Sequence, residues 1–430
     1  MPRRLLVSVG LVLLVAALSL TPPPADSRRL GFLMVWMPLV DSLGFPYNMD
    51  AARFIALGEH PDRLLEKGNG RQSRPAYVAT GYVLGSLLRP LLPGTSSAIV
   101  TNPTYVAFVT LNFVLLIAAV ALWDALFAER RWTFAVLPTA LLLVANRVVR
   151  DFLWMPHTQM FNVLVPVLTM TTFAWAVRHP RTTAPRLAAI GVLVGGLFLY
   201  YGSGVVLVPG IAAGLVAGRR RDGGVGPSLG AQLAALALGF AVLPIVWWVV
   251  VVLVAGEFYS AETADFRQFV WMLDAARSVR PLAVVARRLS TFAWITAQIA
   301  WFPATLCAAA GVAAFVAGVE RRRLVDAHGS LLAAAGVTLA LVVVFFAGMG
   351  WYNERLEWNV APPLLAIAAV LLTALAERVS PPARVAIAVV AVAASVGWLG
   401  HVMCEPRGEV TTGTAGVRSP ACRVLVPFSG

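Results

Sequence analysis

Long apolar blocks alternate with short polar segments along this chain. Most blocks hold about 20 residues, the length of an α-helix that crosses the hydrocarbon core of a bilayer. The pattern therefore predicts an all-α, polytopic membrane protein, built as one integral membrane domain over residues 1–430. Counting the blocks gives about eleven transmembrane helices. We expect them at residues 1–20, 104–127, 133–147, 161–177, 187–201, 204–218, 231–255, 290–318, 330–350, 359–376 and 385–402.

The composition agrees with this pattern. Of the 430 residues, 59% are hydrophobic and 13% are charged, which is about half the charged share of an average soluble domain. The formal net charge is +13. In a soluble protein this charge would suggest a nucleic-acid partner. Here the arginines stand between apolar blocks, so membrane orientation and lipid phosphate explain them better, and no nucleic acid is expected.

Arginine-rich connections indicate the orientation, because cytoplasmic loops carry an excess of basic residues. Arg3 and Arg4 precede the first apolar block and predict a cytoplasmic N-terminus. The other segments assigned to the cytoplasm are 129–131, 178–186, 219–221, 320–323 and 377–384. The large external segments are then residues 21–103, residues 256–289 and the C-terminal tail at 403–430, where Cys404 and Cys422 can pair in an oxidising space.

The segment from Tyr47 to Tyr77, in the first external loop, is the most densely charged part of the chain. Asn48 is suited to cap a helix that runs from about Met49 to Glu59, and Pro61 marks its end. Other surface segments are also expected. These are a helical turn at 62–67, a turn at 69–70, a juxtamembrane helix at 76–92, an interfacial segment at 30–40 and an amphipathic helix within 257–281.

Three stretches resemble the GT-C superfamily, whose members are membrane glycosyltransferases that use polyprenyl-phosphate sugars. They are YNMDAARFIALGEHP with Asp50, the following RQSRPAYVATGYVLG, and the hairpin GVLVGGLFLYYGSGVVLVPGI at 191–211. Members of the superfamily begin in the cytoplasm and place a catalytic Asp or Glu in a long first external loop with juxtamembrane helices. Many members carry adjacent carboxylates directly after the first span. Here Asp41 and Asp50 are separated and lie well past it.

The resemblance implies a cell-membrane enzyme that acts on its extracytoplasmic face. Such an enzyme transfers a sugar from a polyprenyl-phosphate donor to a glycan, lipid or protein acceptor of the cell envelope. The reaction is expected to be a single, inverting displacement at the anomeric carbon. Its partners are therefore the lipid-linked donor, the acceptor and the surrounding membrane lipid.

This transfer needs a carboxylate that accepts the proton of the acceptor hydroxyl. Asp50 is the first candidate for this general base, and Asp41 and Asp151 are the alternatives. A structural interpretation of Asp50 also exists, because it lies in the first turn of a predicted helix, where a negative charge is favourable. There it can pair with Arg53, three residues later.

The transfer also needs cations for the departing phosphate, which arginine binds with fixed geometry. Arg71 and Arg74 are the first candidates, although arginines near an interface often only extend toward water. The other predicted substrate ligands are Arg53, His157, Gln159 and Arg355. A divalent cation held by Asp151 and His157 stays open, but two ligands are a weak metal signal.

Two other functions stay open at this point. An envelope polysaccharide polymerase would also bind lipid-linked sugars through external arginines. A flippase or transporter of lipid-linked sugars would perform no chemistry and would place charged groups near the middle of the membrane. The predicted spans are almost free of ionisable residues and the charges gather in the external loops. This distribution favours chemistry at the membrane surface.

Overall fold

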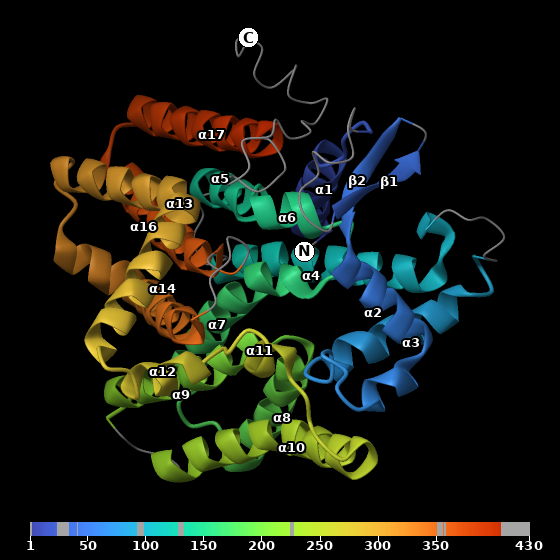
Figure 1. Cartoon of the computed structure of the whole chain (residues 1–430). Coiled ribbons are helices and arrows are strands. Elements are labelled where there is room, and N and C mark those ends of the chain that lie inside the picture. The colour runs from blue at the N-terminus through green and yellow to red at the C-terminus, as the bar shows by residue number, and fades with distance from the viewer. Residues whose placement is uncertain are drawn as a thin grey trace. The chain divides into compact units, whose positions relative to one another are not determined.

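The computed structural model describes residues 2–23, 34–40, 42–92, 99–127, 133–223, 228–350, 356 and 358–405. These residues form sixteen α-helices and one two-stranded sheet (Figure 1), which confirms the predicted all-α class. The chain divides into two compact units. The first comprises Met1–Pro61, Val78–Met160 and Pro382–Gly430, and the second comprises Asp62–Tyr77 and Phe161–Pro381. The charged segment 47–77 is therefore shared between the two units.

Helix α4, Pro103–Leu126, is the centre of the first unit and contacts helices on several sides. Helix α3 packs closely against α4 at Gly81. A Cβ atom on this glycine would lie only 2.1 Å from the ring of Phe108 on α4. The other elements of this unit are α1 (Pro2–Leu18), α2 (Met49–Glu59), α3 (Pro75–Leu88, mostly in this unit), η3 (Ile99–Thr101), α5 (Thr133–Val144), α6 (Arg147–Phe152), η4 (Thr158–Met160) and α17 (Pro381–Cys404).

A short β-hairpin precedes α2 and was not expected from the sequence. Strand β1, Met34–Val40, pairs antiparallel with β2, Leu43–Asn48. Each strand contains a proline, Pro38 and Pro46, and prolines argue against a strand unless it lies at an edge. In a sheet of two strands both are edges, so the prolines are tolerated. The apolar run at 30–40 was interpreted as an interfacial segment, and its described part is instead the first strand of this hairpin.

Helix α2 begins and ends where the sequence predicts. The side chain of Asn48, the last residue of β2, accepts a hydrogen bond of 2.9 Å from the backbone N–H of Ala51. Pro61 follows the C-cap residue His60 and starts the 3₁₀ turn η2, Pro61–Leu65. Because the strand ends at the cap itself, the hairpin fixes the point at which α2 starts.

The second unit is built around two helices, α7 (Phe161–Arg178) and α16 (Ala361–Arg378), which are the most buried of its long helices. Helix α10, Leu229–Ala255, has the opposite character and exposes most of its apolar surface. The remaining elements are α8 (Ala184–Tyr200), η5 (Gly202–Val206), α9 (Leu207–Arg221), α11 (Ala261–Ala264), α12 (Val270–Ala276), α13 (Pro281–Val316), α14 (Arg321–Met349) and η6 (Trp358–Val360).

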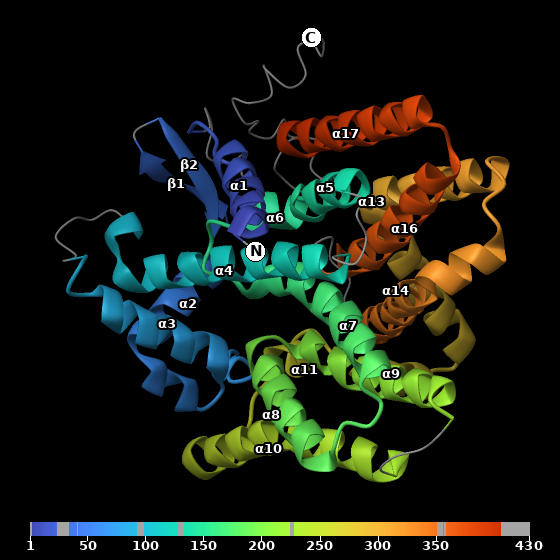
Figure 2. The same ribbon diagram turned by 180° about the vertical axis from the view of Figure 1, so that it is seen from behind.

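Glycines allow two helix pairs of this unit to pack backbone against backbone. On α9, a Cβ on Gly214 would lie 2.6 Å from the carbonyl oxygen of Phe173 on α7. On α8, a Cβ on Gly191 would lie 2.4 Å from the carbonyl oxygen of Leu236 on α10. Helices α8 and α10 lie side by side in both views (Figure 1 and Figure 2). Small residues at four-residue spacing are typical of helix packing in membranes, where burial from water does not drive association.

Eight of the described helices are long and apolar enough to cross a membrane. Four shorter apolar helices accompany them, at Leu5–Leu18, Pro75–Leu88, Ala135–Val144 and Ala184–Tyr200. The predicted spans correspond to the eight long helices and three of the short ones, while Pro75–Leu88 is the helix expected beside the membrane. At about 1.5 Å per residue, the short helices do not cover roughly 30 Å of hydrocarbon by themselves.

Contacts in the second unit join predicted external segments to each other and to the neighbouring predicted spans. The indole N–H of Trp247 donates to the carbonyl of Gln72 at 2.7 Å, and the Gln72 side chain accepts from the N–H of Tyr259 at 2.8 Å. The indole N–H of Trp271 donates to the carbonyl of Gly348 at 2.8 Å. The first external loop therefore contacts the loop after α10, and that loop contacts the end of α14.

A matching cluster joins segments that were predicted to be cytoplasmic. The side chain of Gln232 at the start of α10 donates to the carbonyls of Pro180 and Thr182 at 3.0 and 2.6 Å. It accepts from the guanidinium of Arg219 at the end of α9. Within this unit the connections 178–186 and 219–221 thus lie together at the start of α10.

The segment 257–281, in which the sequence predicts one amphipathic helix on the external face, has a different structure. It holds two short helices, α11 and α12, and the residues between them include two with positive φ, Arg267 at 51° and Phe269 at 61°. The N–H of Phe269 is bonded to the carbonyl of Met349 at 3.1 Å. That tertiary bond interrupts the helical pattern that the aromatic spacing suggests.

Candidate active site

Asp50 lies in the first turn of α2, next to the cap. Its carboxylate is 3.9 Å from the guanidinium of Arg53, which is mostly exposed. An exposed pair of this kind contributes little to stability. The same carboxylate is 3.8 Å from Nε2 of His157. The Asp50 side chain is 32% exposed and that of His157 is 3% exposed, so of the two groups it is Asp50 that an incoming molecule can reach.

The imidazole of His157 is enclosed by aromatic rings. Its centroid lies 5.8 Å from the ring of Phe54 and 5.2 Å from the ring of Phe152, and both contacts are edge-to-face. Phe54 follows Asp50 by four residues on α2, so the two side chains lie on the same face of that helix. Helix α2 therefore contacts His157 with both the carboxylate of Asp50 and the aromatic ring of Phe54.

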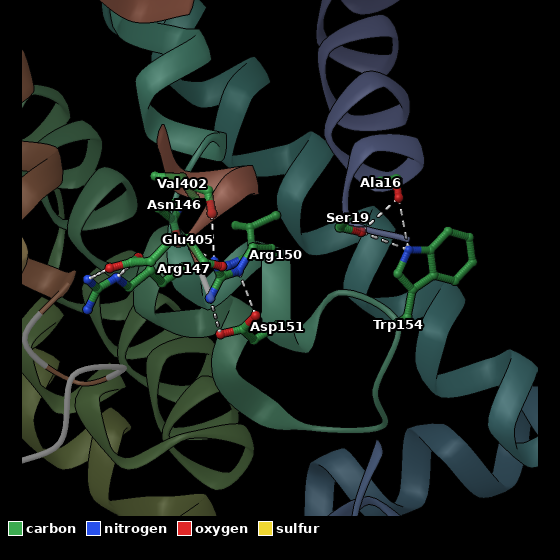
Figure 3. A network of polar contacts seen from close by, with 10 residues as sticks. Ala16, Ser19, Asn146, Arg147, Arg150, Asp151, Trp154, Val402 and Glu405 are labelled. Atoms are coloured by element: carbon green, nitrogen blue, oxygen red, sulfur yellow. Dashed lines mark hydrogen bonds and ion pairs between the residues drawn. The ribbon is translucent and has the colours of Figure 1, made fainter. Parts of the chain in front are cut away.

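The loop that carries His157 starts at α6, which is tied to the end of α17 (Figure 3). The Asn146 side chain caps α6 by accepting from the N–H of Val149 at 2.9 Å. Arg147 forms a bidentate ion pair with the carboxylate of Glu405. Buried Arg150 donates to the carbonyls of Val402 and Glu405 at 2.6 and 3.0 Å. These bonds fix the position of α6.

The rest of the loop is held from two other helices. The indole N–H of Trp154 donates to the carbonyl of Ala16 on α1 and to the hydroxyl of Ser19 directly after that helix, both at 3.1 Å (Figure 3). The buried amide of Asn112 on α4 donates to loop carbonyls, most closely to that of Met155 at 2.6 Å. The hydroxyl of Tyr105 donates to the carbonyl of Trp154 at 2.9 Å. The loop thus presents His157 from a fixed backbone.

The other candidates for the base are in different situations. Both oxygens of Asp151 accept from the guanidinium of Arg150, at 2.7 and 3.1 Å. Arg147 pairs with Glu405, and Arg150 pairs with Asp151. Asp41 lies outside the described residues, as does the predicted substrate ligand Arg355.

Gln159, predicted as a substrate ligand, is buried in η4 and is 3% exposed. Among the residues that the structure describes, no three His, Cys, Asp or Glu side chains gather into a metal-binding group. The prediction of a Cys404–Cys422 disulfide involves a residue outside the described part of the chain.

Arg74 lies in the second unit, where it pairs with Glu262 of α11. Its Nη2 atom is 2.8 Å from a Glu262 oxygen, and both side chains are largely buried. The hydroxyls of Ser73 and Ser260 donate to the other oxygen of the carboxylate, at 3.1 and 3.0 Å. The guanidinium of Arg74 also lies over the ring of Tyr201, 5.5 Å from its centroid.

These contacts set the ionisation of Glu262. Burial of the carboxyl group opposes its charge, but the neighbouring Arg74 and, more weakly, Arg71 favour it, as do a backbone hydrogen bond and the Ser260 hydroxyl. The net result is a pKa of Glu262 below its ordinary value of 4.5. Glu262 is therefore an anion at neutral pH, held by two arginines that the sequence had suggested as phosphate ligands.

Buried Gln72 fixes the segment that carries both arginines. Its amide N–H₂ donates to the carbonyl of Glu66 at 2.9 Å, in addition to its bonds with Trp247 and Tyr259. Asn69 turns the chain as predicted, because its side chain accepts from the N–H of Arg71 at 2.9 Å. Arg71 and Arg74 thus start from an anchored backbone.

The fold defines this chain as a multi-pass, α-helical membrane protein. Comparison with protein-family models, with curated proteins and with solved structures finds no match for it.

Sequence reasoning gave no role to Glu262, Ser73 or Glu405, although Glu262 pairs with Arg74, Ser73 donates to Glu262, and Glu405 pairs with Arg147. Their partners are far away in the sequence, so no local spacing reveals them. The one available signal was the number of acidic residues in the external segments, which suggested that the arginines there would have carboxylate neighbours.

Proposed function

We propose that this protein is a glycosyltransferase of the cell membrane that uses a polyprenyl-phosphate sugar as donor. It acts on the extracytoplasmic face, has a cytoplasmic N-terminus and transfers the sugar to a glycan, lipid or protein acceptor of the envelope. The observation that carries the proposal is the pairing of a partly exposed carboxylate, Asp50, with a buried histidine, His157. A carboxylate that is accessible on one side and supported on the other is suited to general base catalysis.

In the proposed reaction the acceptor oxygen attacks the anomeric carbon of the donor. The bond from that carbon to the phosphate oxygen breaks, a bond to the acceptor oxygen forms, and polyprenyl phosphate leaves with the bonding electrons. Asp50 takes the proton of the acceptor hydroxyl. His157 is a positioning residue, because it is buried and reaches the reaction only through Asp50.

Asp50 is a better candidate than Asp151 on structural grounds. Arg150 binds both oxygens of Asp151 and joins it to the end of α17. A carboxylate in a bidentate pair with arginine is a strong structural contact, and its oxygens are occupied. The guanidinium of Arg53 and Nε2 of His157 lie 3.9 and 3.8 Å from the Asp50 carboxylate, distances longer than those of the Arg150–Asp151 hydrogen bonds.

The departing phosphate needs cations, and arginine is the residue type proposed to supply them. Arginine suits this purpose because its planar fork matches phosphate oxygens. The charge distribution of the sequence supports chemistry over transport, because the predicted spans are almost free of ionisable residues and the charges gather in the connections.

The direct test is an assay of the purified protein with a panel of polyprenyl-phosphate sugars. Transfer of radiolabelled sugar to a cell-envelope extract is the expected result, and the labelled product identifies the acceptor class. If the protein binds no polyprenyl-phosphate sugar from the panel, the glycosyltransferase proposal fails. If it moves the lipid across a vesicle bilayer without breaking the sugar–phosphate bond, the transporter alternative is correct.

A further inference from the structure

The carboxylate of Glu262 lies in a group of donors that also suits a phosphate. It accepts from the guanidinium of Arg74 at 2.8 Å, the hydroxyl of Ser73 at 3.1 Å and the hydroxyl of Ser260 at 3.0 Å. A guanidinium together with hydroxyl donors is a common way to bind the oxygens of a phosphate group. An internal carboxylate therefore occupies a cradle for oxyanions.

The charges around this cradle are unequal. Arg74 contacts the carboxylate directly, and the positive charge of Arg71 also favours the anionic form of Glu262 and lowers its pKa, more weakly. The aromatic face of Tyr201 supports the guanidinium of Arg74 from another side, and such a contact adds to the orientation of the cation. A phosphate group offers more oxygens than a carboxylate and satisfies more of these donors.

The segment that carries Glu262 is anchored on both sides of it. The N–H of Tyr259 bonds to Gln72 at 2.8 Å, and the N–H of Phe269 bonds to the carbonyl of Met349 at 3.1 Å. Between these anchors α11 has only four residues. Arg267 and Phe269 have φ values of 51° and 61°, which are unfavourable for residues other than glycine. Glu262 therefore stands between two anchored points of the chain.

We infer that Glu262 is an internal competitor for a phosphate site formed by Ser73, Arg74 and Ser260. The ligand is the phosphate head group of a lipid, which takes the place of the carboxylate on Arg74. This inference rests on the proposed function for the identity of the lipid, a polyprenyl phosphate. It adds a role for Glu262, whose carboxylate competes with the head group for Arg74 and so lowers the affinity of the site for the lipid.

The test compares binding to the full-length protein in detergent micelles. The probes are a polyprenyl monophosphate, the corresponding polyprenol without phosphate, and inorganic phosphate. The variant Glu262→Gln keeps the shape but removes the charge that competes for Arg74. Glu257→Gln is the matched control, because Glu257 lies five residues earlier and makes only an exposed pair of 3.8 Å with Lys67.

Glu262→Gln is expected to bind the polyprenyl monophosphate about threefold to tenfold more tightly than the wild type, the range expected when a modest ion pair stops competing. Glu257→Gln and the polyprenol should show no such gain, and adding Arg74→Gln to Glu262→Gln should abolish it. An equal gain with inorganic phosphate assigns the site to the head group alone. A gain that needs the lipid assigns the chain a share of the binding.

Unchanged or weaker binding by Glu262→Gln would overturn the inference and leave the Arg74–Glu262 pair as a structural contact. If this variant is not recovered folded, Glu262→Asp, whose carboxylate is one methylene shorter, should change affinity in the same direction. Transfer activity is scored separately. Tighter phosphate binding by Glu262→Gln without any sugar transfer would support this phosphate site and reject the glycosyltransferase proposal. Sugar transfer without tighter binding by Glu262→Gln would reject the phosphate site and support the glycosyltransferase proposal.

Discussion

The Nε2 atom of His157 lies 3.8 Å from a carboxylate oxygen of Asp50, although the two residues come from distant segments of the sequence. Phe54 and Phe152 enclose the imidazole, and the bonds of Asn112, Trp154 and Arg150 fix the loop that carries it. A base that is held in this way needs little rearrangement before it accepts a proton.

Replacing His157 should affect turnover more than binding. If His157 orients Asp50, His157→Asn should lower kcat about tenfold, since positioned bases contribute roughly 10²–10⁴ in total, and leave the affinity for the donor unchanged. In the background of Asp50→Asn the same change should have no further effect, because residues that act as a unit are not additive. The measurement is kcat and donor affinity for the two single variants and the double variant.

His60→Gln is the control for that experiment, because His60 is exposed at the end of α2. Equal losses of kcat in His60→Gln and His157→Asn would contradict the assigned role. So would an additive loss in the double variant.

The melting temperature of the protein should depend on the charge of Glu262 at neutral pH, and this dependence should disappear in acid. Because the pKa of Glu262 is lowered in the folded protein, its contribution to stability is complete above its ordinary pKa of 4.5 and is lost as the pH falls through the folded value. The wild type should therefore melt at a higher temperature than Glu262→Gln at pH 7, and the difference should shrink below pH 4.5. A difference that is the same at pH 7 and in acid would show that the charge of Glu262 does not stabilise the fold.

Close packing of α9 on α7 should make Gly214 intolerant of a side chain. A Cβ there would lie 2.6 Å from a backbone oxygen, so Gly214→Ala should cost about 1–3 kcal/mol through overpacking. Gly336 on α14 has nothing within 4 Å of the same position. Gly336→Ala should be neutral or stabilising, because alanine favours a helix. Thermal melting in detergent compares the two, and equal effects would exclude the packing explanation.

Orientation in the membrane can be tested by labelling. In a variant without native cysteines, a cysteine at Asn69 should react with an impermeant thiol reagent in intact cells, and a cysteine at Arg220 should react only after lysis. The reason is the excess of arginine in the segments assigned to the cytoplasm. The opposite pattern would invert the topology, and equal labelling in sealed cells would reject the assignment.

Local signals predicted the helices well. The cap at Asn48 and the stop at Pro61 set the ends of α2, and the apolar blocks placed the long helices. The hairpin at 34–48 was missed because Pro38 and Pro46 argue against strands, and only the pairing of two edge strands makes them acceptable. Propensity rules see single segments and do not see such pairings.

The candidate site was predictable only by residue type. Asp50, Arg74 and His157 could be chosen because polar groups beside a membrane are costly unless they serve a purpose. That His157 faces Asp50 and that Glu262 binds Arg74 are consequences of tertiary packing. No spacing in the sequence encodes them.

The central claim is that Asp50 is the general base, and it is tested most directly by Asp50→Asn with Asp62→Asn as control. Asp62 is an exposed carboxylate twelve positions later in the same loop. Sugar transfer and donor binding are measured in the same purified preparations. The account predicts that Asp50→Asn transfers sugar about 100-fold or more slowly and still binds the donor, while Asp62→Asn behaves as the wild type. Near-normal transfer by Asp50→Asn would contradict the account and direct the search to Asp41 and Asp151.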